Sequence, residues 1–299
     1  MFLVFAFALV SIVYAQQSTP LVPAMLTFGD SVVDVGNNDY LPTIFRANYP
    51  PYGRDFANQK PSGRFCNGKL AIDITAKTLG FTTYPPAYLS PEASGSNLLI
   101  GANFTSAGSG YDNRAASLNN YYVNPLVNHA YTPDQYGSFL IDAFTRFIQN
   151  VYGLGVRKIG ITSLPPLGCI PLARTLFGYH EKGCVSRFNT DAQQFNKKLN
   201  AAATNLQKQH SDLKIVVFDI YKALLDVVNT PSNYGKGRVF PCFSLVDEKR
   251  DFFNGFLDAT SGCCGIGTVE TTIFMCNPYT LGTCPNASKY VFWDSVHPS

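Results

Sequence analysis

The sequence predicts an α/β protein with a mostly parallel sheet and helices on both faces. Short apolar runs at residues 24–28, 98–104, 156–161 and 214–218 have the composition of buried strands. Two helical stripes at spacings of three and four alternate with them, namely Leu140, Phe144, Phe147 and Val151, then Phe188, Ala192, Phe195, Leu199, Ala202 and Leu206. This alternation requires crossover connections, which make neighbouring strands parallel.

The remaining elements are shorter. The first strand stops at Gly29-Asp30-Ser31 and the second stops in small residues at 106–110, so both end in tight turns. Residues 37–67 are Pro-, Gly- and Asn-rich and predict a surface loop, whereas residues 70–79 predict a short helix. Two long polar stretches, residues 111–134 and 236–260, match no strand or helix, which is unusual in a compact domain.

Length, composition and the N-terminus predict one exported domain. Residues 1–15 are apolar, carry no charge and end in Val-Tyr-Ala, which is typical of a cleaved signal peptide. A membrane anchor is the alternative, but a spanning helix needs roughly 20 residues. Residues 16–299 show no linker and form a single expected domain. A charged fraction of 14% and a net charge of +3 leave no basic face for nucleic acid.

Eight cysteines in an exported chain favour disulfides over a metal site, because Cys263 and Cys264 are adjacent and no histidine lies close to them. The pairing is open, although the short loops from Cys169 to Cys184 and from Cys276 to Cys284 are natural closures. Two acceptor patterns for N-glycosylation occur. Asn286, in a polar loop, is favoured over Asn103, which lies in an apolar run and is expected to be buried.

Ser31 is a candidate nucleophile because it follows a buried strand at the edge where parallel α/β sheets gather their ligands. The alternative is a turn in which Ser31 caps a helix. Of the four histidines, His129, His180 and His210 lie in polar, surface-like contexts. His297 follows the strand-like run Tyr290–Phe292 in a turn with Asp294, whose carboxylate could orient an imidazole base.

Several segments resemble the plant GDSL esterase/lipase family within the SGNH hydrolase superfamily. Phe28-Gly29-Asp30-Ser31-Val32-Val33-Asp34-Val35-Gly36-Asn37-Asn38 resembles its first conserved block, Asn103-Phe104-Thr105-Ser106-Ala107-Gly108-Ser109-Gly110 its second and Asp294-Ser295-Val296-His297-Pro298 its last. Residues 164–171 and Gly262-Cys263-Cys264-Gly265 are also similar to plant members. The match covers nearly the whole mature chain, in the family's order.

This resemblance implies a flavodoxin-like three-layer α/β/α sandwich, the SGNH hydrolase fold, and a secreted serine carboxylic ester hydrolase of the extracellular space or cell wall. Ser31 would be the nucleophile, His297 the general base and Asp294 its orienting carboxylate. The backbone N–H groups of Ser31 and Gly108 would form the oxyanion hole. No metal or organic cofactor is implied. Acyl lipids, acetylated wall polysaccharides and cutin-like esters all remain open as substrates.

The chain departs from the family pattern at three places. The third block, a strand ending in a Gly-x-Asn-Asp-like turn that supplies another oxyanion donor, has no counterpart, and neither Asn119 nor Asn120 follows a strand. Residues 236–260 have the character of an insertion that adds Cys242, and the chain stops soon after His297, where relatives continue into a helix. One strand of the sheet is therefore expected to be missing.

These departures leave two alternatives to an active esterase. The first is a non-catalytic extracellular binding protein that keeps the cleft of the fold. The second is the product of an altered transcript or an imperfect gene model, a chain that would not fold stably.

Overall fold

The structure is a computed structural model that describes residues 20–109, 121–122, 124–234, 255–265, 276, 280 and 282–299. The expected signal peptide, the two asparagines 119 and 120, Cys242 and most of the expected insertion lie outside these ranges.

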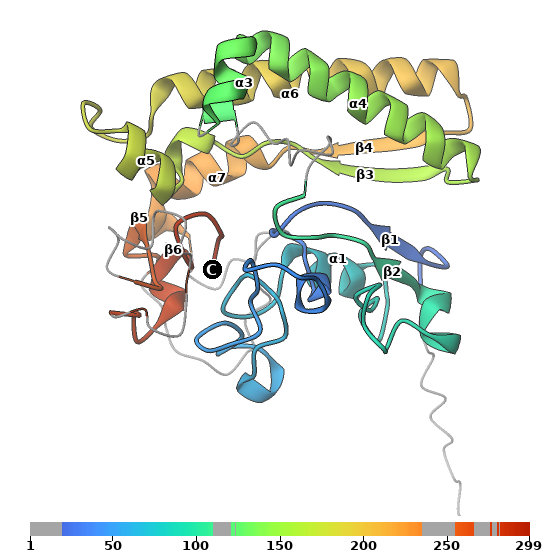
Figure 1. Cartoon of the computed structure of the whole chain (residues 1–299), viewed down its shortest axis with the longest axis horizontal. Coiled ribbons are helices and arrows are strands. Elements are labelled where there is room, and N and C mark those ends of the chain that lie inside the picture. The colour runs from blue at the N-terminus through green and yellow to red at the C-terminus, as the bar shows by residue number, and fades with distance from the viewer. Residues whose placement is uncertain are drawn as a thin grey trace, which may run out of the picture.

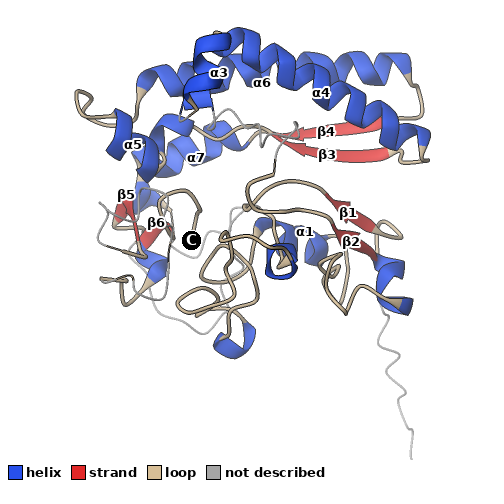
Figure 2. Cartoon of the chain, in the orientation of Figure 1, coloured by secondary structure: helices blue, strands red, loops and turns tan. Residues whose placement is uncertain are grey.

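All strand pairs are parallel. Strand β1 (Met25–Thr27) pairs with β2 (Gly101–Asn103), β3 (Lys158–Thr162) pairs with β4 (Lys214–Phe218), and β5 (Asp258–Gly262) pairs with β6 (Tyr290–Phe292). Among the described residues these pairs form three separate two-stranded sheets (Figure 2). Parallel pairing between strands distant in sequence confirms the expected α/β class.

Two long helices cover the β3–β4 pair. Helix α4 (Pro133–Gly153) and helix α6 (Ser186–Gln209) pack against each other and lie over one face of these strands (Figure 1). Both expected stripes point into the core, where Leu140, Phe144, Phe188 and Leu199 are almost completely buried. Each fully buried side chain of this size contributes roughly 1.5–3 kcal/mol, so the stripes explain why these helices form here.

The opposite face of the β3–β4 pair is largely uncovered. Side chains alternate along a strand, and Val216 and Phe218 of β4 point away from the helices with about half of their surfaces exposed, 55% and 50%. Leu26 of β1 is 50% exposed. These uncovered apolar side chains agree with the expectation that one strand of the sheet is missing from this chain.

The shorter helices include one that the sequence predicted and three that it did not. Helix α1 (Ala71–Thr78) confirms the expected helix. Helices α3 (Pro125–Ala130), α5 (Pro171–Phe177) and α7 (Ile220–Asn229) were not expected.

The prediction that residues 111–134 hold no regular element was wrong for the part that the structure describes. Pro125 opens α3 behind an Asn124 cap, and Pro133 opens α4 behind a Thr132 cap. Proline fits the first helical turn because the N–H it lacks would have no partner there.

The second polar stretch, residues 236–260, also differs from expectation at its end. It includes the start of β5, so it is not wholly without regular structure. The Phe256 N–H donates to the carbonyls of Pro231, at 3.1 Å, and Tyr234, at 3.0 Å. The chain therefore returns at residue 256 to the place that it left at residue 234, as an inserted segment would.

The described cysteines form three disulfides. Cys169–Cys184 closes the expected short loop. The expected Cys276–Cys284 closure was wrong: Cys264 pairs with Cys276 and Cys263 pairs with Cys284. The adjacent cysteines thus each tie the end of β5 to a different point of the following loop. Cys66 is a buried thiol, and burial raises its pKa to about 12.

The described part of the chain contains no helix that is long and apolar enough to cross a membrane. Nor do its histidines, cysteines and carboxylates gather into a cluster that could hold a metal ion.

Candidate active site

Ser31, His297 and Asp294 form a continuous hydrogen-bonded series. The Ser31 Oγ lies 2.8 Å from Nε2 of His297, and Nδ1 of His297 lies 2.8 Å from Oδ2 of Asp294. A hydroxyl, an imidazole and a carboxylate in this order can move the hydroxyl proton to the imidazole. The structure brings together the three residues that the sequence singled out, although Ser31 and His297 are 266 positions apart.

The turn after β6 holds the imidazole and the carboxylate in place. Oδ1 of Asp294 accepts the backbone N–H groups of Val296, at 2.8 Å, and His297, at 2.7 Å. The Trp293 N–H donates to the His297 carbonyl and closes the turn. Asp294 and His297 are 0% and 2% exposed. This rigid, dry setting fixes which ring nitrogen faces Ser31.

The pKa of His297 is raised above its ordinary value of 6.5. Burial lowers it, but the charge of Asp294 and the hydrogen bond to Asp294 outweigh burial and favour the protonated ring, with Asp30 adding to the effect. An imidazole held beside a buried carboxylate is thereby made a stronger base.

Ser31 lies in a tight turn directly after β1. The Val33 N–H donates to the Asp30 carbonyl, and Oδ1 of Asp30 accepts the Val32 N–H at 3.1 Å. Gly29, which opens the turn, has φ of +154°, and a Cβ there would approach Cγ2 of Val33 to 2.7 Å. A glycine is required at this point for the chain to turn and expose the hydroxyl.

A buried polar network joins the Ser31 loop to the loop that carries Gly108. The carboxylate of Asp34 accepts the N–H groups of Gly36 and Asn37 in its own loop, each at 2.8 Å, and that of Ala107 in the other, at 3.0 Å. The amide of Asn38 donates to the Ala107 carbonyl. Asp34 is fully buried, so these bonds are shielded from water.

Gly108 ends this second loop with φ of +83°, and a Cβ at this position would meet nothing within 4 Å. Among the described residues its backbone therefore borders open space, and no acceptor is bonded to the N–H of Gly108 or of Ser31.

Sequence reasoning missed the bracing roles of Asp34, Asn37 and Asn38. The amide of Asn37 donates to the carbonyls of Asn103 and Thr105, both at 2.8 Å. All three residues belong to the segment that resembles the first conserved block of the family, so the resemblance already marked them. Their hydrogen-bond partners at residues 103–107 lie far along the chain, and sequence alone does not show that the two segments meet.

Aromatic side chains pack beneath the His297–Asp294 pair. The Phe65 ring lies 5.6 Å from the His297 ring, and Tyr52 contacts both Phe65 and Trp293. The pKa of Tyr52 is raised well above its ordinary value by burial and by the charge of Asp294. No local pattern in the sequence predicts this packing, because its members lie far apart along the chain.

The other candidate residues lie elsewhere. His129 is on α3, His180 is in an exposed turn, and His210 ends α6 with its ring on Tyr152. Asn103 is 1% exposed, as expected, and its amide donates to the Val33 carbonyl. Asn286 is half-exposed in its loop.

A parallel α/β protein that presents a serine hydroxyl, an imidazole and a buried carboxylate in series has the architecture of a serine hydrolase. Residues 25–299 match the family described as GDSL-like Lipase/Acylhydrolase. The chain belongs to this family, and its members' activity makes it a carboxylic ester hydrolase.

Its relatives include three proteins of Arabidopsis thaliana. GDSL esterase/lipase APG is 59% identical over 345 residues, covering 99% of this chain and 91% of the relative. GDSL esterase/lipase At5g03820 is 44% identical, with 98% and 92% covered, and At3g53100 is 43% identical, with 97% and 91% covered. The first alignment is longer than the 299 residues of this chain, so that relative has residues with no counterpart here.

Proposed function

We propose that the chain hydrolyses esters through a covalent acyl-enzyme on Ser31, with His297 as general base and Asp294 as its orienting carboxylate. The observation that carries the proposal is the 2.8 Å approach of the Ser31 hydroxyl to the imidazole, whose other nitrogen is held by a buried carboxylate.

In acylation, the Ser31 oxygen attacks the ester carbonyl while its proton passes to Nε2 of His297. The carbonyl oxygen becomes an oxyanion, and the N–H groups of Ser31 and Gly108 donate to it. Asp294 stabilises the protonated imidazole. Collapse of the tetrahedral intermediate breaks the bond to the alcohol, which takes the proton from His297 and leaves.

In deacylation, a water molecule takes the place of the alcohol. Nε2 of His297 removes a proton from the water as its oxygen attacks the acyl carbonyl. The second tetrahedral intermediate expels the Ser31 oxygen, which recovers its proton from His297. The carboxylic acid is released and the enzyme returns to its starting state.

The proposal is tested with a short-chain aryl ester and the variant Ser31→Ala. We expect this variant to lose hydrolysis and to keep the circular dichroism spectrum and melting temperature of the wild type. Ser138→Ala, on the exposed side of α4, removes a hydroxyl remote from His297 and serves as the matched control. Activity retained by Ser31→Ala would overturn the proposal.

A second candidate, a binding protein with little catalytic power, is favoured by one observation. The side-chain amides of Asn37 and Asn38 each donate to two backbone carbonyls, which uses both of their N–H groups, so neither can replace the oxyanion donor that the third block supplies in the family. Loss of one such donor costs roughly 100- to 1000-fold in turnover. A fluorophosphonate probe separates the candidates, because it reacts with an activated serine even where ester turnover is slow.

We also propose that the protein is secreted. The three disulfides and the apolar segment at residues 1–15 support export. Expression with and without residues 1–15 in plant cells tests this, since only the full chain is expected in the medium.

Lipids and acylated polysaccharides of the cell wall are the substrate classes proposed.

A further inference from the structure

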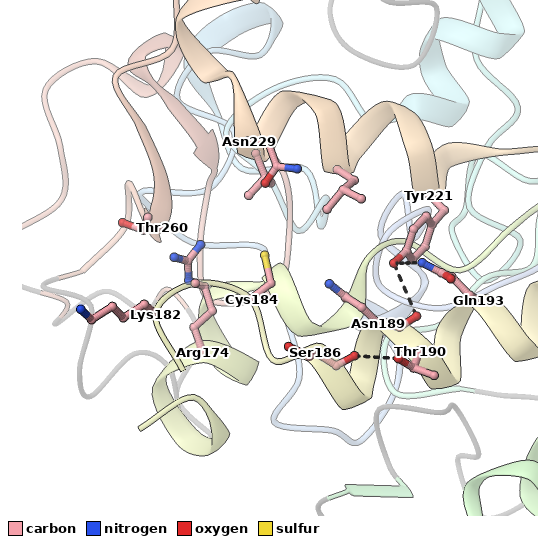
Figure 3. Close-up of a pocket in the computed structure, with 13 residues that line it drawn as sticks. Arg174, Lys182, Cys184, Ser186, Asn189, Thr190, Gln193, Tyr221, Asn229 and Thr260 are labelled. Carbon is pink, nitrogen blue, oxygen red and sulfur yellow. Dashed lines mark hydrogen bonds between the residues drawn. The ribbon is translucent and has the colours of Figure 1, made fainter. Parts of the chain in front are cut away.

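A second concave site lies apart from Ser31, Asp294 and His297, none of which lines it. It is a pocket of about 570 Å³ bounded by α5, the N-terminal part of α6, α7 and β5 (Figure 3). This volume lies within the range of roughly 300–1,000 Å³ that small-molecule sites occupy.

Two cationic side chains line the pocket. The Arg174 side chain projects between Thr260 and Cys184, and Lys182 lies on the same side of the pocket (Figure 3). In the part of the chain that the structure describes, neither cation makes an ion pair. The negative charge of Asp258 stabilises the charged Arg174 guanidinium from a distance, but the Asp258 carboxylate is hydrogen-bonded to Thr260 and Ser261. A half-buried guanidinium without a close counter-ion favours an anionic ligand.

The rest of the lining suits a sugar. The amide of Asn229 offers donors and an acceptor, and the Thr260 hydroxyl, which donates to Asp258, can still accept a hydrogen bond. Leu225 and Val228 provide an apolar patch for ring C–H groups. Figure 3 shows the Asn229 amide on the wall opposite Arg174.

One feature disfavours phosphate. The first N–H of helix α6, at Ser186, is occupied by Oε2 of Glu181 at 2.7 Å, and the Ser186 hydroxyl donates to the same oxygen at 2.6 Å. A phosphate would therefore meet a carboxylate where a helix N-terminus would otherwise hold it. A singly charged carboxylate is repelled less by Glu181 than a phosphate is, and its two oxygens match paired N–H donors of the Arg174 guanidinium.

We propose that this pocket binds a carboxylated saccharide of the uronate type, with the Arg174 guanidinium pairing the carboxylate and Lys182 adding attraction at the rim. The same helix links the pocket to the catalytic turn, because the Leu172 N–H at the start of α5 donates to the Ser295 carbonyl at 2.9 Å. An acylated acidic polysaccharide is accordingly the substrate class that fits. This last step rests on the proposed function, whereas the binding itself does not.

The test is calorimetric titration of the full chain carrying Ser31→Ala with a tetramer of galacturonate. We expect one site per chain. Arg174→Gln is expected to weaken binding by at least about tenfold, as loss of a charge-assisted hydrogen-bonded pair does, and Lys182→Gln by a smaller factor. Arg146→Gln, at an exposed position on α4 outside the pocket, makes the same charge change and should bind as the parent does.

Four results would overturn the proposal, and the first three concern the tetramer itself. They are no binding of the tetramer, equal affinity for a neutral galactose tetramer, and unchanged affinity in Arg174→Gln with its melting temperature preserved. Inorganic phosphate that competes as well as the uronate would show a general anion site and would also overturn it. Because Ser31→Ala cannot turn over, these results are independent of whether the wild type hydrolyses esters.

Discussion

The substitution Asp34→Asn tests whether the network between the two loops maintains the catalytic geometry. Asparagine has the same shape as aspartate and keeps one oxygen, which can still accept the N–H groups of Gly36 and Asn37. Its NH₂ group, however, would face the Ala107 N–H, which now bonds to Oδ2 of Asp34 at 3.0 Å. The change therefore removes the one Asp34 contact that reaches the loop of Gly108.

The expected cost follows from that single contact. A buried hydrogen bond to a charged group contributes about 1.5–3 kcal/mol, so the free energy of unfolding should fall by roughly this amount. Because Ala107 is adjacent to Gly108 in sequence, displacement of the Ala107 N–H should also move the Gly108 N–H, the proposed oxyanion donor. We expect kcat for an aryl ester to fall by roughly 100-fold or more, with a much smaller change in KM.

The assay combines urea unfolding with steady-state kinetics. Thr204→Val is the control for a polar substitution outside both sites, since Thr204 is exposed on α6 and its hydroxyl donates to the Asn200 carbonyl of its own helix. A variant Asp34→Asn with lowered stability and wild-type kcat would refute the reasoning, because the network would then support the fold and not the catalytic geometry.

Three further predictions follow from the same geometry. Because a protonated His297 cannot accept the Ser31 proton, hydrolysis should be lost as pH falls through the raised pKa of His297; a midpoint of kcat/KM below 6.5 would contradict this. Asp294→Asn should lower kcat by about four orders of magnitude and shift that midpoint downward; Asp142→Asn on α4 is the exposed control. Excision of residues 235–254 with Tyr234 joined to Gly255 should leave the melting temperature unchanged or raise it, since these ends already meet, and a collapse of folding would show that the segment is structural.

The sequence predicted those parts of the fold in which local pattern and tertiary burial agree. The predicted α6 stripe is buried except for the partly buried Ala202, and the β4 run at Lys214–Phe218 has the expected bounds. In the α4 stripe Leu140 and Phe144 are buried, whereas Phe147 and Val151 are only partly buried. The second strand is shorter than its apolar run, because residues 98–100 form a turn of 3₁₀ helix before β2 begins. Hydrophobicity alone does not distinguish a buried turn from a strand.

The disulfide pairing and the buried polar network between the Ser31 and Gly108 loops could not be predicted from local sequence pattern. Both depend on which distant segments meet in space. Short sequence separation favoured Cys276 with Cys284, but the position of β5 brings Cys263 and Cys264 to them instead. Likewise, Asp34 and Ala107 are 73 positions apart, and only the fold shows that they bond.

The central claim, that Ser31 is an activated nucleophile, is tested most directly by mass spectrometry of the chain after reaction with a fluorophosphonate. We expect one phosphonylated serine per chain, located at Ser31, and no reaction in His297→Ala. Labelling at another serine, or a Ser31 that stays unmodified in a folded chain, would contradict the account.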